Sequence, residues 1–442
     1  MKDCEAWLHF GREGTPIMTL SGPAPHSWGG RLGGGFGAPF LTNLYLMLSF
    51  FSASTRMVNS RNAISECLES ALGADKSCDL VILSASIGHD YQALINQVRE
   101  LAPGARVVGA SCCGIVGKEG VSESMKDVAL MAVRGKEFAV AHVDEINGRN
   151  SFEKAAEMAR QLKARQPDIN MIQFLASGID IANDQAIAGI ESVFGPEVTI
   201  FGATSSDNMR GVVSYQMVDD TVYEHAAWAV GFADPTLTIE TQATHGFMAV
   251  GEPMMVTKAD GTRIIELNGR PAWQEYTARL GLDAMTATCG DSIPVGALAE
   301  QLPEDQAAEY GNPHILRVVT KRDADGSMHY ATEIRAGTKL WLTVRDEERI
   351  FADMDRMMMQ MNDRADGKKP VAVFHADCLA RGRYLFNRVM KEELVSRMQF
   401  PLSDDGVVPP WLGMYGFGEI ARLGGANTYH NYTTAIYAIY RH

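Results

Sequence analysis

The feature that most constrains the fold is a strand, helix, strand pattern that the sequence repeats. The three copies occupy residues 80–111, 172–204 and, in a looser form, 371–413. In the first copy, apolar runs at 80–84 and 107–111 flank a segment with helical spacing of apolar residues. A short unbroken apolar run predicts a strand that is covered on both faces. Repetition of one unit therefore predicts an α/β fold, with mixed β-sheets flanked by helices.

Small or polar residues follow the second strand of each copy. These three ends are residues 111–114, 205–207 and 415–419. Because ligands of α/β proteins collect beyond the carboxyl ends of strands, we expect the ends to wall a pocket. The alternative is that small residues there only permit tight packing. The candidate ligand-binding residues are Ser111, Cys112, Cys113, Ser205, Asp207, Cys378, Arg381, Glu419, His430 and Asn431.

The stretch 411–434 is the first place to expect a ligand. Its dense glycines permit close approach of another group, and Glu419 is the only carboxylate within an apolar, glycine-rich surround. Arg381 could hold a ligand carboxylate in a bidentate fork, or it could pair with Glu419 inside the fold. A buried terminal hairpin whose polar groups satisfy one another is the structural alternative to a binding site.

The cysteines and histidines allow weaker hypotheses. Cys112, Cys113 and Cys378 each lie just past a predicted strand, where a nearby base could activate a thiol as the nucleophile of a cysteine-dependent enzyme. Small fillers at a strand end are the favoured alternative. The cluster at 375–378 lacks the paired spacing of a zinc site, so no metal is assigned. Noncovalent haem stays open because the chain has 11 histidines, although no cofactor is expected.

Composition narrows the class of partner. The chain carries 54 acidic and 40 basic residues, a formal charge of −14, which disfavours nucleic acid and anionic lipid. Its cysteines are odd in number and include no CxxC pair, which is typical of reduced thiols in the cytoplasm. We therefore expect a cytoplasmic protein with a small-molecule ligand and no membrane association.

Residues 1–56 differ from the rest of the chain. They contain clustered glycines and an apolar run at 40–53, shorter than the roughly 20 residues that a spanning helix needs. We expect a poorly ordered leader, which makes Met57 a candidate start. A membrane-tethered N-terminus is the alternative.

Two further segments allow structural predictions. Residues 283–311 hold two prolines and many polar residues, which predicts a long loop. Met354, Met357, Met358 and Met361 recur at helical spacing, which predicts a buried stripe, with a pliable partner surface as the alternative.

The chain also resembles a known family, the FIST sensory domains of bacterial signal-transduction proteins and of a eukaryotic F-box protein. The resemblance spans residues 57–442 and is carried by Val108-Gly109-Ala110-Ser111-Cys112-Cys113-Gly114, Val256-Thr257-Lys258, the run at 265–272, Cys378 with Arg381-Gly382, Gly418-Glu419-Ile420 and His430-Asn431-Tyr432-Thr433.

The resemblance implies two FIST domains packed together, an N-terminal one at 57–245 and a C-terminal one at 246–442. It implies a small ligand, with amino acids a frequent suggestion, and some members bind haem and respond to nitric oxide. No kinase, cyclase or receiver segment follows His442 and no F-box precedes Met57. We therefore expect signalling through a separate protein such as a kinase or cyclase.

Overall fold

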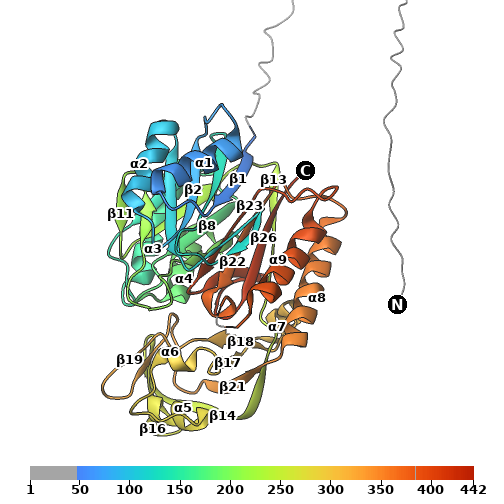
Figure 1. The fold of residues 1–442 in the computed structure, drawn as a ribbon. Coiled ribbons are helices and arrows are strands. Elements are labelled where there is room, and N and C mark those ends of the chain that lie inside the picture. Colours follow the sequence, from blue (N-terminus) through green and yellow to red (C-terminus); the bar gives the residue numbers. More distant parts are fainter. Residues whose placement is uncertain (1–46, 384) are drawn as a thin grey trace, which may run out of the picture. The chain divides into compact units, whose positions relative to one another are not determined.

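One order of elements occurs three times in the chain: strand, helix, strand, helix, strand, hairpin, strand (Figure 1). The computed structural model describes residues 47–383 and 385–442. The first copy comprises β1 (Ser49–Thr55), α1 (Ser60–Leu72), β2 (Leu80–Ser86), α2 (Tyr91–Leu101), β3 (Arg106–Cys112), β4 (Ile115–Gly117), β5 (Gly120–Ser122) and β6 (Val128–Arg134). The predicted α/β class, with mixed sheets and repeated units, is confirmed.

The other two copies follow the same order. The second comprises β7 (Phe138–Val143), α3 (Ser151–Arg165), β8 (Met171–Ala176), α4 (Asn183–Phe194), β9 (Thr199–Thr204), β10 (Gln216–Val218), β11 (Thr221–Tyr223) and β12 (Ala227–Phe232). The third comprises β13 (Leu237–Thr244), α8 (Glu347–Ala365), β22 (Ala372–Cys378), α9 (Arg388–Leu402), β23 (Trp411–Gly416), β24 (Glu419–Leu423), β25 (Ala426–His430) and β26 (Thr434–Arg441). A short 3-10 helix, Leu379–Arg381, follows β22.

Each copy builds one six-stranded sheet, and the three sheets have matching strand orders. These orders are β1-β6-β2-β3-β10-β11, β7-β12-β8-β9-β24-β25 and β13-β26-β22-β23-β4-β5. In every sheet the two strands that flank the second helix of the copy are parallel, and the last strand of the copy runs antiparallel beside them.

The hairpins are exchanged between the copies. The hairpin β4–β5 of the first copy pairs with β23, the hairpin β24–β25 of the third pairs with β9, and the hairpin β10–β11 of the second pairs with β3. Each sheet is thus completed by a hairpin from another copy, and the exchange closes in a ring. Two of the sheets contain strands from both sides of the expected 245/246 boundary, which stays a prediction.

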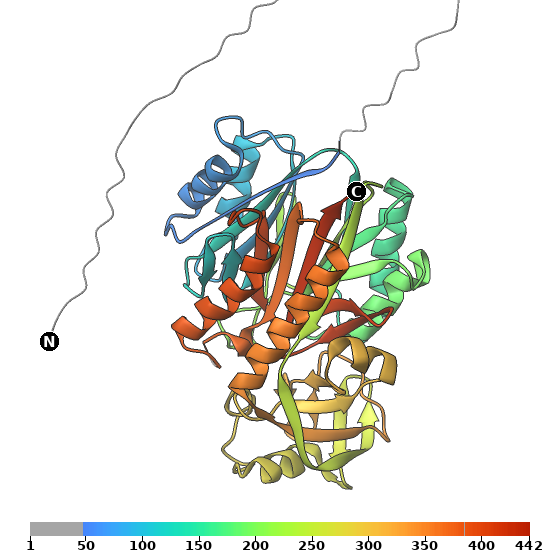
Figure 2. The same cartoon turned by 90° about the vertical axis from the view of Figure 1, so that its right-hand side faces the viewer.

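The helices cover the outer faces of the sheets, and the inner faces pack on one another. In β2, Leu80 and Ile82 belong to the central core, whereas Val81 and Leu83 pack with α1 and α2. Side chains of successive strand residues point to opposite faces, so a strand buried on both sides is apolar throughout. Figure 2 shows α8 and α9 lying side by side over the third sheet.

Local signals account for several helix boundaries. The Asp90 carboxylate accepts the Ala93 amide at 3.0 Å and so caps α2. The predicted methionine stripe of α8 is buried at all four positions, which confirms its role in the core. In the third copy, helix α9 begins at Arg388, so Phe386 precedes the helix that the sequence pattern assigned to it.

A separate segment is inserted into the third copy between β13 and α8. It comprises β14 (Phe247–Asp260), β15 (Arg263–Leu267), β16 (Arg270–Pro271), α5 (Ala272–Leu280), α6 (Cys289–Ser292), β17 (Leu298–Gln301), α7 (Glu304–Tyr310), β18 (His314–Arg317), β19 (Lys321–Arg322), β20 (Met328–His329) and β21 (Lys339–Arg345). Figures 1 and 2 show it beyond one end of the three sheets.

The expected long loop at 283–311 is wrong in part. This range contains α6, β17 and α7, and β17 pairs with β18 and β21. The prolines that suggested a loop lie between these elements: Pro303 immediately precedes α7, and its fixed φ suits a helix start.

The expectation of a disordered leader is wrong for its last residues. Residues 49–55 form β1, which pairs with β6 along its whole length, and Phe50 and Ala53 are buried. The last residues of the apolar run at 40–53 therefore belong to an ordinary buried strand. The rest of the expected leader, residues 1–46, lies outside the described residues.

Candidate functional site

The second parallel strands of the three copies end against one another. The Cys113 amide donates to the Tyr415 carbonyl at 3.0 Å, and the Ser206 amide donates to the Ser111 carbonyl at 3.0 Å. The Ser206 hydroxyl donates to the Tyr415 carbonyl at 2.8 Å, and so joins the second copy to the third. The strand ends thus meet as expected, while their role as the walls of a ligand pocket stays a prediction. We call residues 111–114, 204–207 and 415–419 the tip cluster.

Three of the predicted site residues use their side chains in hydrogen bonds within the protein. The Ser111 hydroxyl donates to the Ser206 carbonyl at 2.8 Å and accepts the Tyr215 amide. The Ser205 hydroxyl accepts from the Gln216 side chain at 2.6 Å. The carboxylate of Asp207 accepts four successive backbone amides, those of residues 210–213. Their hydrogen-bonding groups are already engaged by protein, so their observed contacts are structural.

Arg381 is buried and paired, but not with the expected partner. Its Nε donates at 2.9 Å to Asp377, four residues earlier in β22, and its Nη1 donates to the His245 carbonyl at 3.2 Å. The guanidinium also lies over the Phe386 ring. The expected internal ion pair with Glu419 is therefore replaced by a pair with Asp377, because the 3-10 helix after β22 brings these two side chains together.

Glu419 begins β24 and is fully buried. Its Oε2 accepts the Thr433 amide at 3.3 Å, while its Oε1 has no hydrogen-bond partner among the described residues. Burial raises the pKa of this carboxyl well above its usual range, the nearby Asp377 adds to the rise, and Arg381 opposes it. The neutral acid is therefore the favoured form in the folded protein.

His430 lies directly across from Glu419 in the β24–β25 pairing. Its ring is 5.2 Å from the ring of Tyr310, between centroids, and Nε2 is 2.7 Å from the Thr428 hydroxyl. Nδ1 is buried without a partner among the described residues. Burial, aided by Arg317, lowers the pKa of His430 to about 3, so the imidazole is neutral at physiological pH.

The following loop joins the tip cluster to the inserted segment. The Asn431 side chain donates to the Phe417 carbonyl at 3.0 Å. Tyr432 takes a left-handed backbone conformation, with φ of 55°, and its hydroxyl donates to the Ile293 carbonyl at 3.0 Å. Left-handed backbone is strained for a large side chain and persists only where surrounding contacts hold it. The loop is thus fixed on both sides.

The three cysteines are buried thiols. Burial raises the pKa of Cys113 to about 11, against the effect of Arg383 and Lys391, and it raises the pKa of Cys112 and Cys378 well above the usual range. Because the thiolate is the nucleophile, these surroundings give the cysteine-enzyme hypothesis no support.

Several polar residues at the site were not identified from the sequence. Glu123 is nearly buried and contacts the Lys391 ammonium, and it accepts the Arg383 amide at 2.9 Å. Asp377 and His245 surround Arg381. Asp377 sits four residues before Arg381, a spacing that could have suggested the pair. Glu123 and His245 come from distant segments and carry no local signal.

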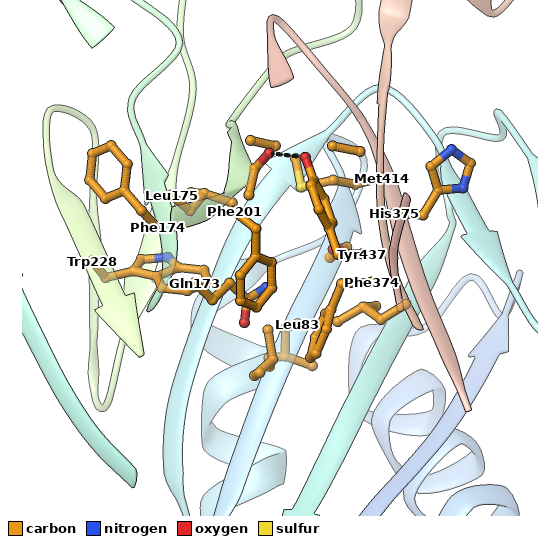
Figure 3. Close-up of a pocket in the computed structure, with 16 residues that line it drawn as sticks. Leu83, Gln173, Phe174, Leu175, Phe201, Trp228, Phe374, His375, Met414 and Tyr437 are labelled. Carbon is orange, nitrogen blue, oxygen red and sulfur yellow. Dashed lines mark hydrogen bonds between the residues drawn. The ribbon is translucent and has the colours of Figure 1, made fainter. Parts of the chain in front are cut away.

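A small cavity lies among the inner faces of the three sheets (Figure 3). Its volume is about 30 Å³, and Gln173, Phe201, Phe374 and Tyr437 are among its lining residues. None of the predicted site residues lines it. Ligand pockets are typically about 300 Å³ or more, so this cavity has room for water only.

Two of the buried histidines, His375 and His245, are poorly placed to bind haem. His375 lines the 30 Å³ cavity, which is far too small for a porphyrin. His245 uses both ring nitrogens, since Nδ1 accepts the Phe247 amide and Nε2 faces the His314 carbonyl. Residues 47–383 and 385–442 contain no group of three or more His, Cys, Asp or Glu side chains placed to hold a metal ion.

Comparison with known proteins identifies the family. The FIST N domain model matches residues 79–270, and the FIST C domain model matches residues 272–422. The chain belongs to the FIST family. FIST domains indicate a sensory domain of signal transduction. The expected pairing of an N-terminal with a C-terminal FIST domain is confirmed.

The FIST chain has mycobacterial relatives. An uncharacterized protein of Mycobacterium bovis is 26% identical over 47% of this chain and 52% of its own length. The chain thus matches about half the length of this relative. An uncharacterized protein of Mycobacterium tuberculosis is 22% identical over 81% of this chain and 90% of its own.

Solved structures with detectable likeness are distant from this FIST protein. A cyanuric acid hydrolase from A. caulinodans has a TM-score of 0.33 at 9% identity, covering 90% of this chain and all of that one. The T. maritima protein PurL has a TM-score of 0.19 at 10% identity, covering 89% and 72%. Within the part of the chain that the structure describes, no helix has the length and apolar character to cross a membrane.

Proposed function

We propose that this FIST protein is a cytoplasmic sensor that binds a small polar metabolite, with amino acids as the first candidates, at the tip cluster. The observation that carries the proposal is the unpartnered Oε1 of Glu419, fully buried where strand ends of the three copies meet. A buried polar atom without a partner costs about 1–3 kcal/mol, so it is retained most readily where a ligand completes it.

The buried Arg381 guanidinium suits a ligand with a carboxylate. The Arg381 guanidinium already donates within the protein, from Nε to Asp377 and from Nη1 to the His245 carbonyl. A guanidinium binds carboxylates in preference to other acceptors because its donors form a planar fork. Asp377 keeps Arg381 oriented. This supports Arg381 as the anion contact and Glu419 as the contact to a polar group.

Signalling then requires a separate protein, such as a kinase or a cyclase. The loop that follows β25 supports a route for the signal, because Thr433 contacts Glu419 while Tyr432 contacts the inserted segment. A ligand that engages Glu419 would therefore act on the backbone that anchors the insert.

Titration calorimetry with the twenty L-amino acids, preceded by native mass spectrometry of the purified protein, tests the binding. We expect at least one amino acid to bind, and Arg381→Lys to weaken it about tenfold because the fork is lost. Arg397→Lys, at an exposed arginine of α9, is the matched control and should bind normally. Absence of binding by all twenty and of any retained small molecule would contradict the proposal.

The output is tested separately with purified components. A candidate kinase or cyclase should change its rate when this protein is added with the bound amino acid, and should change it less with the Arg381→Lys variant. Equal rates with and without ligand would contradict signalling through that partner.

A further inference from the structure

Glu419 and His430 form a matched pair of open hydrogen-bonding groups. They are direct partners across β24 and β25, so their side chains stand on the same face of the hairpin. Both residues are at most 1% exposed, and Glu419 Oε1 and His430 Nδ1 lack partners among the described residues. Two unpartnered polar atoms on directly paired residues of one hairpin point to a missing third group.

The hydrogen bonds around His430 fix which kind of group is missing there. The Thr428 hydroxyl donates its proton to the Ala421 carbonyl at 3.2 Å. We therefore assign the ring proton to Nε2, so that Nε2 donates to the Thr428 hydroxyl at 2.7 Å. Nδ1 then carries the free lone pair and can accept a hydrogen bond from a donor.

The carboxyl of Glu419 lacks an acceptor for its proton, whereas His430 lacks a donor. Oε2 already accepts the Thr433 amide, so the proton of the neutral acid is placed on Oε1. Oε1 then offers a donor that no described residue accepts. The pair together presents one donor and one acceptor to whatever lies between them.

The second copy shows the same position with both ends filled. Gln216 occupies in the hairpin on β3 the place that Glu419 occupies in the hairpin on β9, opposite Ala110 and Ala203 respectively. Its Oε1 accepts the amide of Ala226, the residue before β12, as Glu419 accepts that of Thr433 before β26. Its other end is satisfied by Ser205, whereas the other end of Glu419 is open.

We propose that Glu419 and His430 form a subsite for a small neutral group that accepts one hydrogen bond and donates another, of the carboxamide or hydroxyl class. The inference deepens the proposed function at the same site. A carboxamide oxygen accepts from Glu419 Oε1, and its N–H donates to His430 Nδ1. In the ligand as a whole, Arg381 takes the carboxylate and this subsite takes the neutral end.

The surrounding charges disfavour a charged group at this position. Arg317 donates to the Tyr429 carbonyl beside His430, and Arg381 lies near Glu419, so both oppose a cation. Asp377 and the lone pair of His430 Nδ1 oppose an anion. The other titratable groups that face the pair are Cys378, Tyr310, Tyr429, Tyr437 and His245, all buried.

The test uses two pairs of probes on the full chain, each neutral against anionic. Acetamide and acetate probe the subsite alone, and L-glutamine and L-glutamate probe the whole site. The readout is the ¹⁵N signal of His430 Nδ1 in histidine-labelled protein, assigned with His430→Asn. His375, whose Nδ1 is also buried without a described partner, serves as the spectator. Long incubation is needed because the subsite is enclosed.

We expect acetamide to shift the His430 Nδ1 signal with no shift at His375, and acetate to shift neither. L-Glutamine should bind about tenfold or more tightly than L-glutamate, the usual effect of losing one buried hydrogen bond. Glu419→Gln keeps a donor at the same place and should bind L-glutamine within about threefold. Glu419→Leu removes the donor and should weaken binding about tenfold.

The possible negative results distinguish the subsite from the proposed amino-acid sensor. Equal or stronger effects of acetate and L-glutamate, or an unmoved His430 signal with both neutral probes, would overturn the subsite even if an amino acid binds elsewhere in the cluster. A His430 shift with acetamide and no amino-acid binding would leave the subsite standing and remove the proposed amino-acid sensor. Loss of binding in Glu419→Gln would show that an ionised carboxylate is required and would overturn the neutral subsite.

Discussion

At the scale of single residues, the ion pair of Arg381 and Asp377 allows a direct test of stability. Both side chains are nearly buried and 2.9 Å apart. Asp377→Asn leaves a buried guanidinium without its counter-charge, so we expect a loss of about 3 kcal/mol in the free energy of unfolding. Urea denaturation measures it. Asp355→Asn, at an exposed pair with Arg397, should cost less than about 1 kcal/mol, and equal losses would contradict the account.

The buried histidines predict how stability depends on pH. Burial lowers the pKa of His430, and of His245, to about 3 in the folded protein, below the value of about 6.5 in the unfolded chain. Between these values the unfolded state binds more protons, so acidification from pH 6.5 to 3 destabilises the fold. Each such histidine contributes about 1.4 kcal/mol per pH unit within that window.

The measurement is the free energy of unfolding in urea at pH 5.5, 5.0 and 4.5. We expect His430→Asn to reduce the pH dependence by about 1.4 kcal/mol per pH unit, even if the variant is less stable overall. His225→Asn, at an exposed histidine, should keep the parent slope. An unchanged slope in His430→Asn would mean that the ring is charged or accessible in the folded state.

The sequence suggests candidate residues for the site but not their arrangement, and their role in binding stays a prediction. Arg381, Glu419 and His430 were found because they follow or face predicted strand ends. Their partners Asp377 and His245 were not, since the direction of a side chain depends on elements distant in sequence. The sequence likewise cannot tell that Ser205 has a bonded partner and Glu419 Oε1 has none.

At the scale of elements, β1 gives a clear prediction. It buries Phe50 and Ala53 and its Ser52 hydroxyl accepts the Trp411 amide at 2.8 Å. A chain beginning at Met57 lacks this strand, and we expect it to lose about 3 kcal/mol or more of stability. A chain beginning at Met47 keeps β1 and is the control. Similar melting temperatures for the two chains would contradict the role of β1.

Elements with continuous apolar runs were the easiest to predict. The strands β2, β3, β8 and β9 and the helices between them lie where the sequence pattern places them. Prediction failed in 283–311 and at β1. In both places the elements are short or adjoin an atypical segment, and their stability comes from strands elsewhere in the chain, such as β21 and β6.

At the scale of the whole molecule, the exchanged hairpins predict that the expected N-terminal domain is not independent. The fragment 47–245, which keeps β1, would lack β23, the partner of β4, and β24, the partner of β9. We therefore expect this fragment to unfold without a cooperative transition. Circular dichroism during urea titration, with the full chain as control, measures it. A sharp transition in the fragment would restore the 245/246 boundary.

The exchange itself could not be predicted from the sequence. The hairpin β4–β5 has strands of three residues each, too short to reveal a partner by pattern. Its docking on β23 follows from the arrangement of the three sheets rather than from local preference. The repeat is visible in the sequence, but its closure into a ring depends on strand pairings between distant segments, which no local pattern indicates.

Because the hairpins are exchanged between copies, the sheets cannot be completed during synthesis until the last copy has been translated. The segment β4–β5 leaves the exit tunnel early, yet its partner β23 is among the last strands to be translated. Until β23 has been translated, the edge of β4 has no partner strand and can pair with other chains. Expression of this protein should therefore respond to chaperone supply and to translation speed more strongly than its native stability would suggest.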